Sequence, residues 1–219
     1  AIWAEDVDLL PQDRRLLHQA LRSERVELTD DAGRLSAADT VIICVPTPIT
    51  GHLTPDLTAL QGACATVVAN ARPGQTIILT STTYIGCTRD FLATPLLERG
   101  LTPGEDVFVA FSPERIDPGV PDHVPGATPR VVGALTAECT SRAAAALTRT
   151  CPSVHPVSGC EAAEMTKLLE NTFRAVNIAL ANEVAEIAGH LGLSAREVID
   201  AAATKPYGFM PFYPGPGVG

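Results

Sequence analysis

The chain is poor in positive charge. Its 219 residues include 16 Lys and Arg against 25 Asp and Glu, which gives a formal net charge of -9 at pH 7. A deficit of this size disfavours a protein that holds a nucleic-acid backbone by summed positive charge. We therefore expect no nucleic-acid partner, although a small phosphorylated ligand needs only a few local donors.

Paired cysteines and long apolar runs are also missing. The six cysteines form no C-x-x-C pair and have no histidine at metal-ligand spacing. This favours reduced, mostly buried thiols over a disulfide framework or a zinc site, so no metal is expected. No signal peptide, lipidation motif or membrane-length apolar run occurs in the sequence. We expect a cytoplasmic protein with no membrane association.

Short apolar runs alternate with amphipathic stretches between about Ser36 and Pro156. Four runs are rich in Val and Ile and predict buried strands: "DTVIICVP" (39–46), "QTIILTST" (75–82), "DVFVAFSP" (106–113) and "RVVGA" (130–134). Helices are predicted at residues 57–70, 88–99 and 137–148. This alternation indicates the α/β class, with a Rossmann-like parallel sheet and right-handed crossovers.

The glycine fingerprint that marks a dinucleotide site in such a sheet is absent. G-x-G-x-x-G does not occur, and the near match "GPGVG" (215–219) neither follows a strand nor opens a helix. Ligands of doubly wound sheets lie outside the carboxyl ends of the strands. The short segments "VPTP", "STT" and "SPER" all follow predicted strands at that edge.

A different pattern begins at Gly159. Residues 160–187 contain no proline and no glycine, which predicts a helix of roughly 30 residues, about 45 Å long. A second helix is predicted after Ser194, which forms a capping box with Glu197 in "SARE". Near the start of the chain, residues 12–21 are expected to be helical.

Lys167 and Asn171 lie four residues apart on the long helix and therefore project from one face, which Arg174 continues. Lys167 could be a solvated helix lysine, or could act with Asn171 to hold an oxygen that becomes negative. The other stripe of this helix is interpreted as a core face, and it comprises Met165, Leu168, Leu169, Phe173, Val176 and Leu180.

Two further side chains at strand ends could carry chemistry. Glu114 in "FSPERIDPG" could be a general base, or a turn carboxylate paired with Arg115. Thr82 could donate a hydrogen bond to a substrate or a water, or could satisfy a strand-end carbonyl.

Seven motifs occur in the order and spacing of the nucleotide-sugar 6-dehydrogenases, and the chain from about residue 5 resembles that family. The motifs are "ADTVIICVPTP", "PDL", "STTYIG", "FSPERIDPG", "TPRVVGA", "AEMTKLLENTFRAVNIALANE" and "ATKPYGFMPFYPGPGVG". The resemblance implies an NAD-binding Rossmann domain, a long central helix through which subunits form a homodimer, and a C-terminal domain for a nucleotide sugar. It also implies oxidation of a sugar C6 alcohol to the uronate with two NAD, through a cysteine thiohemiacetal and thioester.

The resemblance also assigns roles to residues. Thr82 matches a threonine that orders a water, Glu114 the general base, and Lys167 and Asn171 the pair that stabilises an oxyanion and positions that water. The implied NAD-site residues are Val45, Pro46, Thr47, Ser81 and Thr82. The implied substrate-binding residues are Glu114, Arg115, Lys167, Asn171, Tyr213, Gly215 and Gly217.

The sequence departs from the family pattern at two places. The dinucleotide fingerprint with the first β-α-β unit is missing, and so is the cysteine nucleophile that follows the terminal glycines in the family. Residues 1–158 are thus expected to be a partial NAD-binding domain. Residues 159–219 would be the central dimerisation helix and the start of the substrate loop, without the C-terminal domain. We expect this piece alone to be inactive.

The substrate is less constrained. The best-known UDP-glucose enzymes have a second glutamate four residues after the base, where this chain has Pro118. The motifs look more like the branch that oxidises UDP-N-acetylglucosamine or related sugars of polysaccharide biosynthesis. The composition also suits an antibiotic pathway that uses a dTDP- or UDP-hexose. Two other readings stay open: another dehydrogenase of the 6-phosphogluconate and 3-hydroxyacid superfamily, and a non-catalytic dimerisation fragment.

Overall fold

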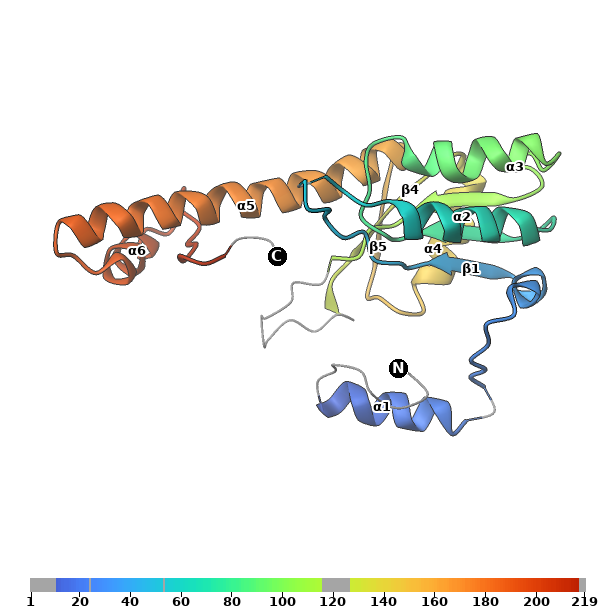
Figure 1. Ribbon diagram of the computed structural model, residues 1–219, viewed down its shortest axis with the longest axis horizontal. Coiled ribbons are helices and arrows are strands. Elements are labelled where there is room, and N and C mark those ends of the chain that lie inside the picture. Colours follow the sequence, from blue (N-terminus) through green and yellow to red (C-terminus); the bar gives the residue numbers. More distant parts are fainter. Residues whose placement is uncertain (1–10, 24, 53, 116–126, 217–219) are drawn as a thin grey trace.

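The computed structural model describes residues 11–23, 25–52, 54–115 and 127–216, and shows a sheet domain from which one long helix projects (Figure 1). Pro118 and Gly217 lie outside the described residues. The sheet has five strands in the order β1-β2-β3-β4-β5. Their bounds are Thr40–Ile43, Thr76–Leu79, Phe108–Phe111, Arg130–Ala134 and Val154–Val157.

The predicted parallel pairing is confirmed for β1, β2 and β3, but is wrong at one position. β4 runs antiparallel to β3 and parallel to β5. Parallel neighbours require a long crossover, usually an α-helix, and the described residues between β3 and β4 contain no α-helix. The sequence did not predict β5, which contains Pro156; as an edge strand, β5 tolerates the missing donor.

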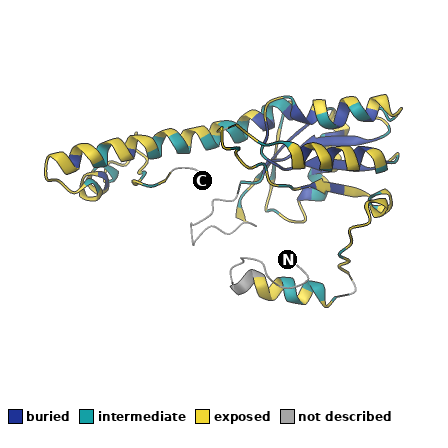
Figure 2. Ribbon diagram, in the orientation of Figure 1, coloured by how far each residue is buried: buried dark blue, intermediate teal, exposed yellow. Residues whose placement is uncertain are grey.

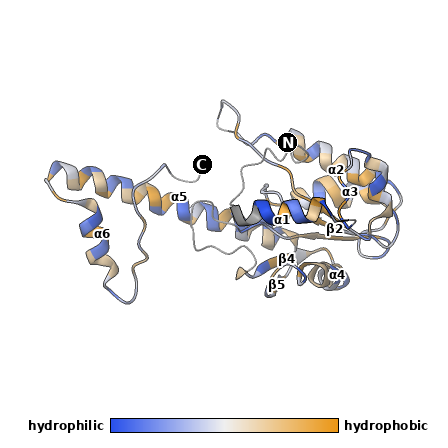
Figure 3. Cartoon of the chain, turned by 90° about the horizontal axis from the view of Figure 1, so that it is seen from below, coloured by the Kyte–Doolittle hydropathy of each residue, from blue (hydrophilic) through white to orange (hydrophobic). Residues whose placement is uncertain are grey.

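Helices cover both faces of the sheet, with α2 and α3 on one side and α4 on the other (Figure 3). The helices before the long one are α1 (Pro11–Leu21), the 3-10 helix η2 (Ala32–Ala37), α2 (Thr58–Asn70), the π-helical turn η3 (Arg89–Ala93), α3 (Thr94–Glu98) and α4 (Ala137–Leu147). One core lies between the sheet and α2, η3 and α3, and a smaller one packs β3 and β4 against α4. Among the described residues, no helix is long and apolar enough to cross a membrane.

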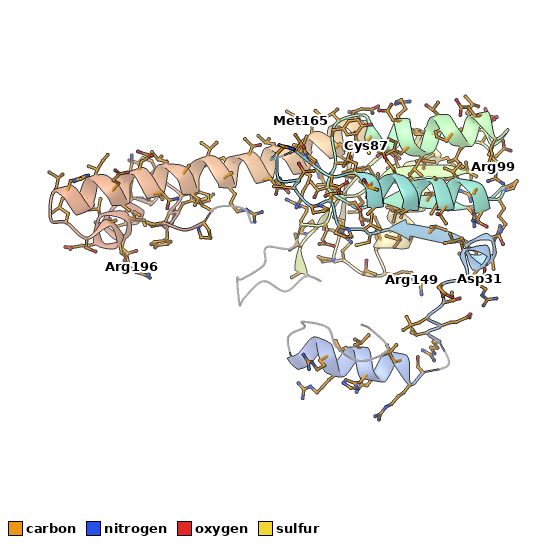
Figure 4. All side chains as sticks on the ribbon, viewed as in Figure 1. Asp31, Cys87, Arg99, Arg149, Met165 and Arg196 are labelled. Carbon is orange, nitrogen blue, oxygen red and sulfur yellow. The ribbon has the colours of Figure 1, made fainter. Side chains whose placement is uncertain are left out.

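The predicted long helix is confirmed as α5 (Cys160–His190), a single helix of 31 residues. Its first turns, where Met165 lies, pack on the sheet, and the rest extends away from it to the region of Arg196, which follows α5 in the chain (Figure 4). The helix α6 (Ala195–Ala203) folds back beside its far end, and Ser194 caps it by accepting the Glu197 N–H as predicted.

The predicted core face of α5 is wrong. Five of its six members are about half exposed or more in the chain: Met165, Leu169, Phe173, Val176 and Leu180. The reason is geometric, because only the start of α5 reaches the sheet, and its outer turns meet little besides α6 and the C-terminal segment (Figure 2). Small residues are buried on the helix instead, including Ala163, Ala181 and Ala188.

The start of α5 is fixed by a close approach of two backbones. A Cβ atom placed on Gly133 of β4 would lie 2.0 Å from the carbonyl oxygen of Gly159 and 2.9 Å from the Cβ of Ala163. Only a residue without a side chain therefore allows α5 to begin at this distance from the sheet.

This contact predicts a large effect of Gly133→Ala. The added methyl group collides with backbone rather than with a flexible side chain, so we expect a loss of about 3 kcal/mol or more in the free energy of unfolding. Denaturant unfolding followed by circular dichroism measures it. Gly62→Ala is the matched control, because an added Cβ at Gly62 on α2 meets nothing within 4 Å. Equal stability of the two variants would contradict the close contact between Gly133 and Gly159.

Candidate active site at the carboxyl ends of the strands

The segments after β1 and β2 are held together at the carboxyl edge of the sheet. The Ser81 hydroxyl accepts the N–H of Val45 at 2.9 Å and donates to the carbonyl of Val45 at 2.8 Å. Just before it, the hydroxyl of Thr80 donates to the carbonyl of Ile43 at 2.9 Å. The hydrogen bonds of Ser81 and Thr80 each join residues about 36 positions apart in the chain. The proposed NAD-site residues on these two segments therefore lie at one edge of the sheet.

Glu114 lies just after β3 and its ion-pair partner is Arg130, the first residue of β4. Its Oε2 is 2.8 Å from Nη1 of Arg130, and its Oε1 accepts the backbone N–H of Arg115 at 2.8 Å. The alternative of an ion pair with the Arg115 side chain is therefore wrong. No sequence pattern indicated Arg130, because the antiparallel placement of β4 beside β3 was not predicted.

The side chain of Arg115 reaches α5 instead. Its Nη2 lies 2.5 Å from Oε1 of Glu170, and its Nη1 donates to the carbonyl of Pro129 at 2.9 Å. Both members of the ion pair are partly buried, at 28% and 32% side-chain exposure, so solvent screens the pair less than a surface pair. Arg115 thus cross-links the segment that contains Glu114 to the helix that contains Lys167 and Asn171. No sequence pattern indicated Glu170 either.

Lys167 is half-buried and belongs to a charged cluster, whose other members are Glu114, Arg115, Glu170 and Arg174. Burial lowers the pKa of its ammonium group; the positive charges of Arg174 and Arg115 act in the same direction, while Glu170 and Glu114 oppose them. Lys167 is thus only partly solvated, and its role in holding a negative oxygen stays a prediction.

Asn171 lies one turn further along α5. Its Oδ1 accepts a hydrogen bond from Nη2 of Arg174 at 3.3 Å. An amide NH2 group has two donors, so Asn171 has the chemistry to donate to an oxygen atom.

Tyr213 and Gly215 lie elsewhere on the helical part of the molecule. The amide of Asn182 donates to the carbonyl of Gly215 at 2.9 Å and accepts its N–H at 2.9 Å. The Tyr213 hydroxyl donates to Asp200 of α6 at 2.7 Å. Asn182 is 11 residues beyond Asn171, which corresponds to about 16 Å along the helix. The structure therefore does not bring Tyr213 and Gly215 together with Lys167 and Glu114.

Three of the six cysteines are poor candidates for a nucleophile. Burial raises the pKa of Cys64 to about 12, of Cys87 to about 11 and of Cys160 to about 12, so their thiols stay protonated at neutral pH. All three are almost fully buried. A buried neutral thiol reacts slowly, because the thiolate is the nucleophilic form.

The lowered pKa of Lys167 can be measured directly. The chain has two lysines, so Lys205→Arg leaves Lys167 as the single lysine for ¹³C dimethylation and NMR titration. We expect a pKa in the folded protein below that in the urea-unfolded chain. The unfolded chain then holds the proton more tightly than the folded protein. Lys167 therefore lowers the free energy of unfolding at pH values below its folded pKa, and this effect disappears as the pH rises above its unfolded pKa. Equal midpoints in both states would contradict the burial of its ammonium group.

Comparison with known proteins places the chain in a family. A family model for the NAD binding domain of UDP-glucose/GDP-mannose dehydrogenases matches residues 9–150, and the model for their central domain matches residues 161–219. Protein CapL of Staphylococcus aureus is 40% identical over 198 residues, which are 89% of this chain and 46% of CapL. UDP-N-acetyl-D-glucosamine 6-dehydrogenase of Pseudomonas aeruginosa is 38% identical over 184 residues, 83% of this chain and 43% of that protein.

Solved structures agree with this placement. The UDP-D-ManNAc dehydrogenase of Pyrococcus horikoshii matches with a TM-score of 0.88 at 33% identity, over 97% of this chain and 51% of that one. The chain thus spans about half the length of the relatives that it matches. The α/β fold and the family predicted from the seven motifs are confirmed, and the chain belongs to the UDP-glucose/GDP-mannose dehydrogenase family.

Proposed function

We propose that the complete protein is an NAD-dependent nucleotide-sugar 6-dehydrogenase, which oxidises the C6 alcohol of an activated hexose by four electrons to the uronate. The observation that carries this proposal is the cross-link of Arg115 to Glu170 at 2.5 Å. It joins the strand-end segment of Glu114 to α5, so that a candidate base and a candidate oxyanion donor, Lys167, share one charged cluster.

The residues at the sheet edge fit NAD. Val45 and Ser81 fasten two neighbouring parallel strand ends to each other, at the edge where doubly wound sheets bind dinucleotides. Pro46, Thr47 and Thr82 follow these two residues directly and would contact the cofactor. When bound there, NAD supplies the hydride acceptor.

The cluster on α5 supports the acid-base and electrostatic steps. The Lys167 ammonium and the Asn171 amide would donate to the sugar oxygen as it becomes negative, which stabilises the transition state more than the ground state. Glu114 would take a proton from water in the second half of the reaction, and Thr82 would orient that water. We propose that the carbon is held meanwhile as a thioester on a cysteine of the complete protein, which keeps the aldehyde from diffusing away.

A UDP-N-acetylhexosamine is the proposed substrate. Relatives at 34–38% identity are named as dehydrogenases of UDP-N-acetyl-D-glucosamine and UDP-N-acetyl-D-mannosamine. UDP-glucose and dTDP-glucose are the alternatives. Tyr213 and Gly215 are proposed to contact this substrate, and their hydrogen bonds to Asp200 and Asn182 hold the segment that contains them against α6 and α5.

The open edge of the sheet supports the proposed division of the chain. In the part that the structure describes, β1 pairs on one side only, and Ile42 on this strand is 51% exposed. A preceding β-α-β unit with the glycine fingerprint would pair with β1 and complete the NAD-binding domain of residues 1–158. Residues 159–219 would connect this domain to a C-terminal nucleotide-sugar domain.

One exposed face of α5 supports a homodimer. Its exposed large apolar side chains are Met165, Leu169, Phe173, Val176, Leu180 and Ile187. Apolar residues scattered singly over a surface do not form a continuous stripe of this length. Such a stripe suits packing against the same helix in a second copy of the chain. A purely structural dimerisation fragment would need this stripe but not the charged cluster around Lys167.

The reaction can be tested on the complete protein with a panel of UDP-N-acetylhexosamines, UDP-glucose and dTDP-glucose. We expect two NADH for each sugar oxidised, and the highest kcat/KM with a UDP-N-acetylhexosamine. One NADH per sugar would refute the four-electron scheme. No NADH from any of these substrates would favour the structural fragment.

Replacing the base tests the second half-reaction. Glu114→Gln cannot take a proton from water, so we expect hydrolysis to slow by about 100-fold or more and the acyl-enzyme to accumulate. Mass spectrometry of the quenched reaction would show the added mass of the nucleotide-linked uronyl group, which is the uronic acid less one water. Glu138→Gln is the control, because Glu138 pairs with Arg142 on the exposed side of α4. Recovery of only unmodified protein from the Glu114 variant would argue against this role.

A further inference from the structure

The most deeply buried carboxylate described in the chain is not used by the proposed reaction. Glu164 is 1% exposed, and it lies on α5 one turn before Lys167. Removing a carboxylate from water is costly unless hydrogen bonds or charges compensate. The surroundings of Glu164 therefore show what its burial achieves.

Three donors meet this carboxylate, and all belong to the segment that leads from β2 into η3. Oε2 accepts the N–H of Gly86 at 2.6 Å, and Oε1 accepts the N–H of Thr88 at 2.9 Å and the Thr88 hydroxyl at 2.6 Å. These N–H groups lie at the start of a helical segment, where the backbone has no partner of its own and the helix dipole favours a negative group. The contacts span 76 to 78 residues of sequence.

This segment is fixed at both ends, and Thr82 lies between them. At one end Ser81 is hydrogen-bonded to Val45 through both its donor and its acceptor. At the other end Gly86 and Thr88 are held by Glu164. The Ser81 contact joins the segment to the end of β1, whereas the buried Glu164 contact joins it to α5.

We propose that Glu164 is a positioning residue that sets the place of Thr82 relative to Lys167. Glu164 and Lys167 are three residues apart on one rigid helix, so the carboxylate transmits the position of α5 to the loop within a single turn. The inference rests on the proposed function in that Thr82 is taken to orient the reacting water. The bracing itself does not depend on that function.

Glu161 offers a matched comparison. It also extends from the start of α5 to this segment, where Oε1 accepts Nε of Arg89 at 2.8 Å, but both side chains are exposed, at 38% and 56%. An exposed pair of this kind contributes little because water and salt screen it. The two glutamates thus differ in burial while they share a helix and a target.

The bracing is tested without any substrate. In Glu164→Gln an amide NH2 replaces one oxygen and faces N–H donors, so we expect the amide protons of Gly86 and Thr88 to exchange about tenfold faster or more by NMR. Glu161→Gln should leave them within about twofold. Unchanged exchange in Glu164→Gln would overturn the bracing. If Glu164→Gln does not fold, Thr88→Ala is the second variant, because it removes the hydroxyl that donates to the Glu164 carboxylate.

The link to Thr82 is tested by a double-mutant cycle on the complete enzyme. We expect Glu164→Gln to lower kcat by about 10- to 100-fold, with KM values for NAD and sugar within about threefold. In a Thr82→Ala background the same change should have little further effect, because its target is already absent. Multiplicative losses would overturn the positioning role and leave a structural one. If the wild type has no dehydrogenase activity, the proposed function fails, while the exchange experiment still decides the bracing.

Discussion

The close approach of β4 to the first turn of α5 is the constraint on which the rest of the structure depends. Gly133 and Gly159 pack backbone against backbone, with no room for a side chain on Gly133. Because α5 is one uninterrupted helix from Cys160 to His190, this contact sets the direction of all 31 residues. The side chains that α5 contributes to the site are placed relative to the sheet by that direction.

Polar contacts then connect α5 to the carboxyl ends of the strands. The buried carboxylate of Glu164 holds the segment after β2, and Glu170 holds Arg115 after β3. Each contact joins residues at least 55 positions apart, and each satisfies a charged group that burial would otherwise penalise. The helix therefore serves as a frame for loops that have little regular structure of their own.

Much of the fold was predictable because local chemistry and packing agree. The strands β1 to β3 are short runs rich in apolar residues, and β4 contains two adjacent valines. The segment from Cys160 to Ile187 contains no proline or glycine, which favours one uninterrupted helix. The antiparallel placement of β4 was not predictable in this way, because the direction of a strand depends on the path of the connection before it, which short apolar runs do not reveal. The strand β5 was not predicted for a related reason. It contains Pro156, which is tolerated only in an edge strand, and the sequence does not reveal which strand lies at the edge.

The sequence by itself determined the α/β class and the family, and it proposed the residues of the candidate site, because these follow from local patterns and from motifs in a fixed order. Tertiary structure alone decided the partners: Arg130 for Glu114, Glu170 for Arg115, and the segment at Thr88 for Glu164. It also decided that the apolar stripe of α5 is exposed in this chain. Periodicity shows which side chains share a face of a helix, whereas the direction of that helix relative to the sheet determines what the face meets.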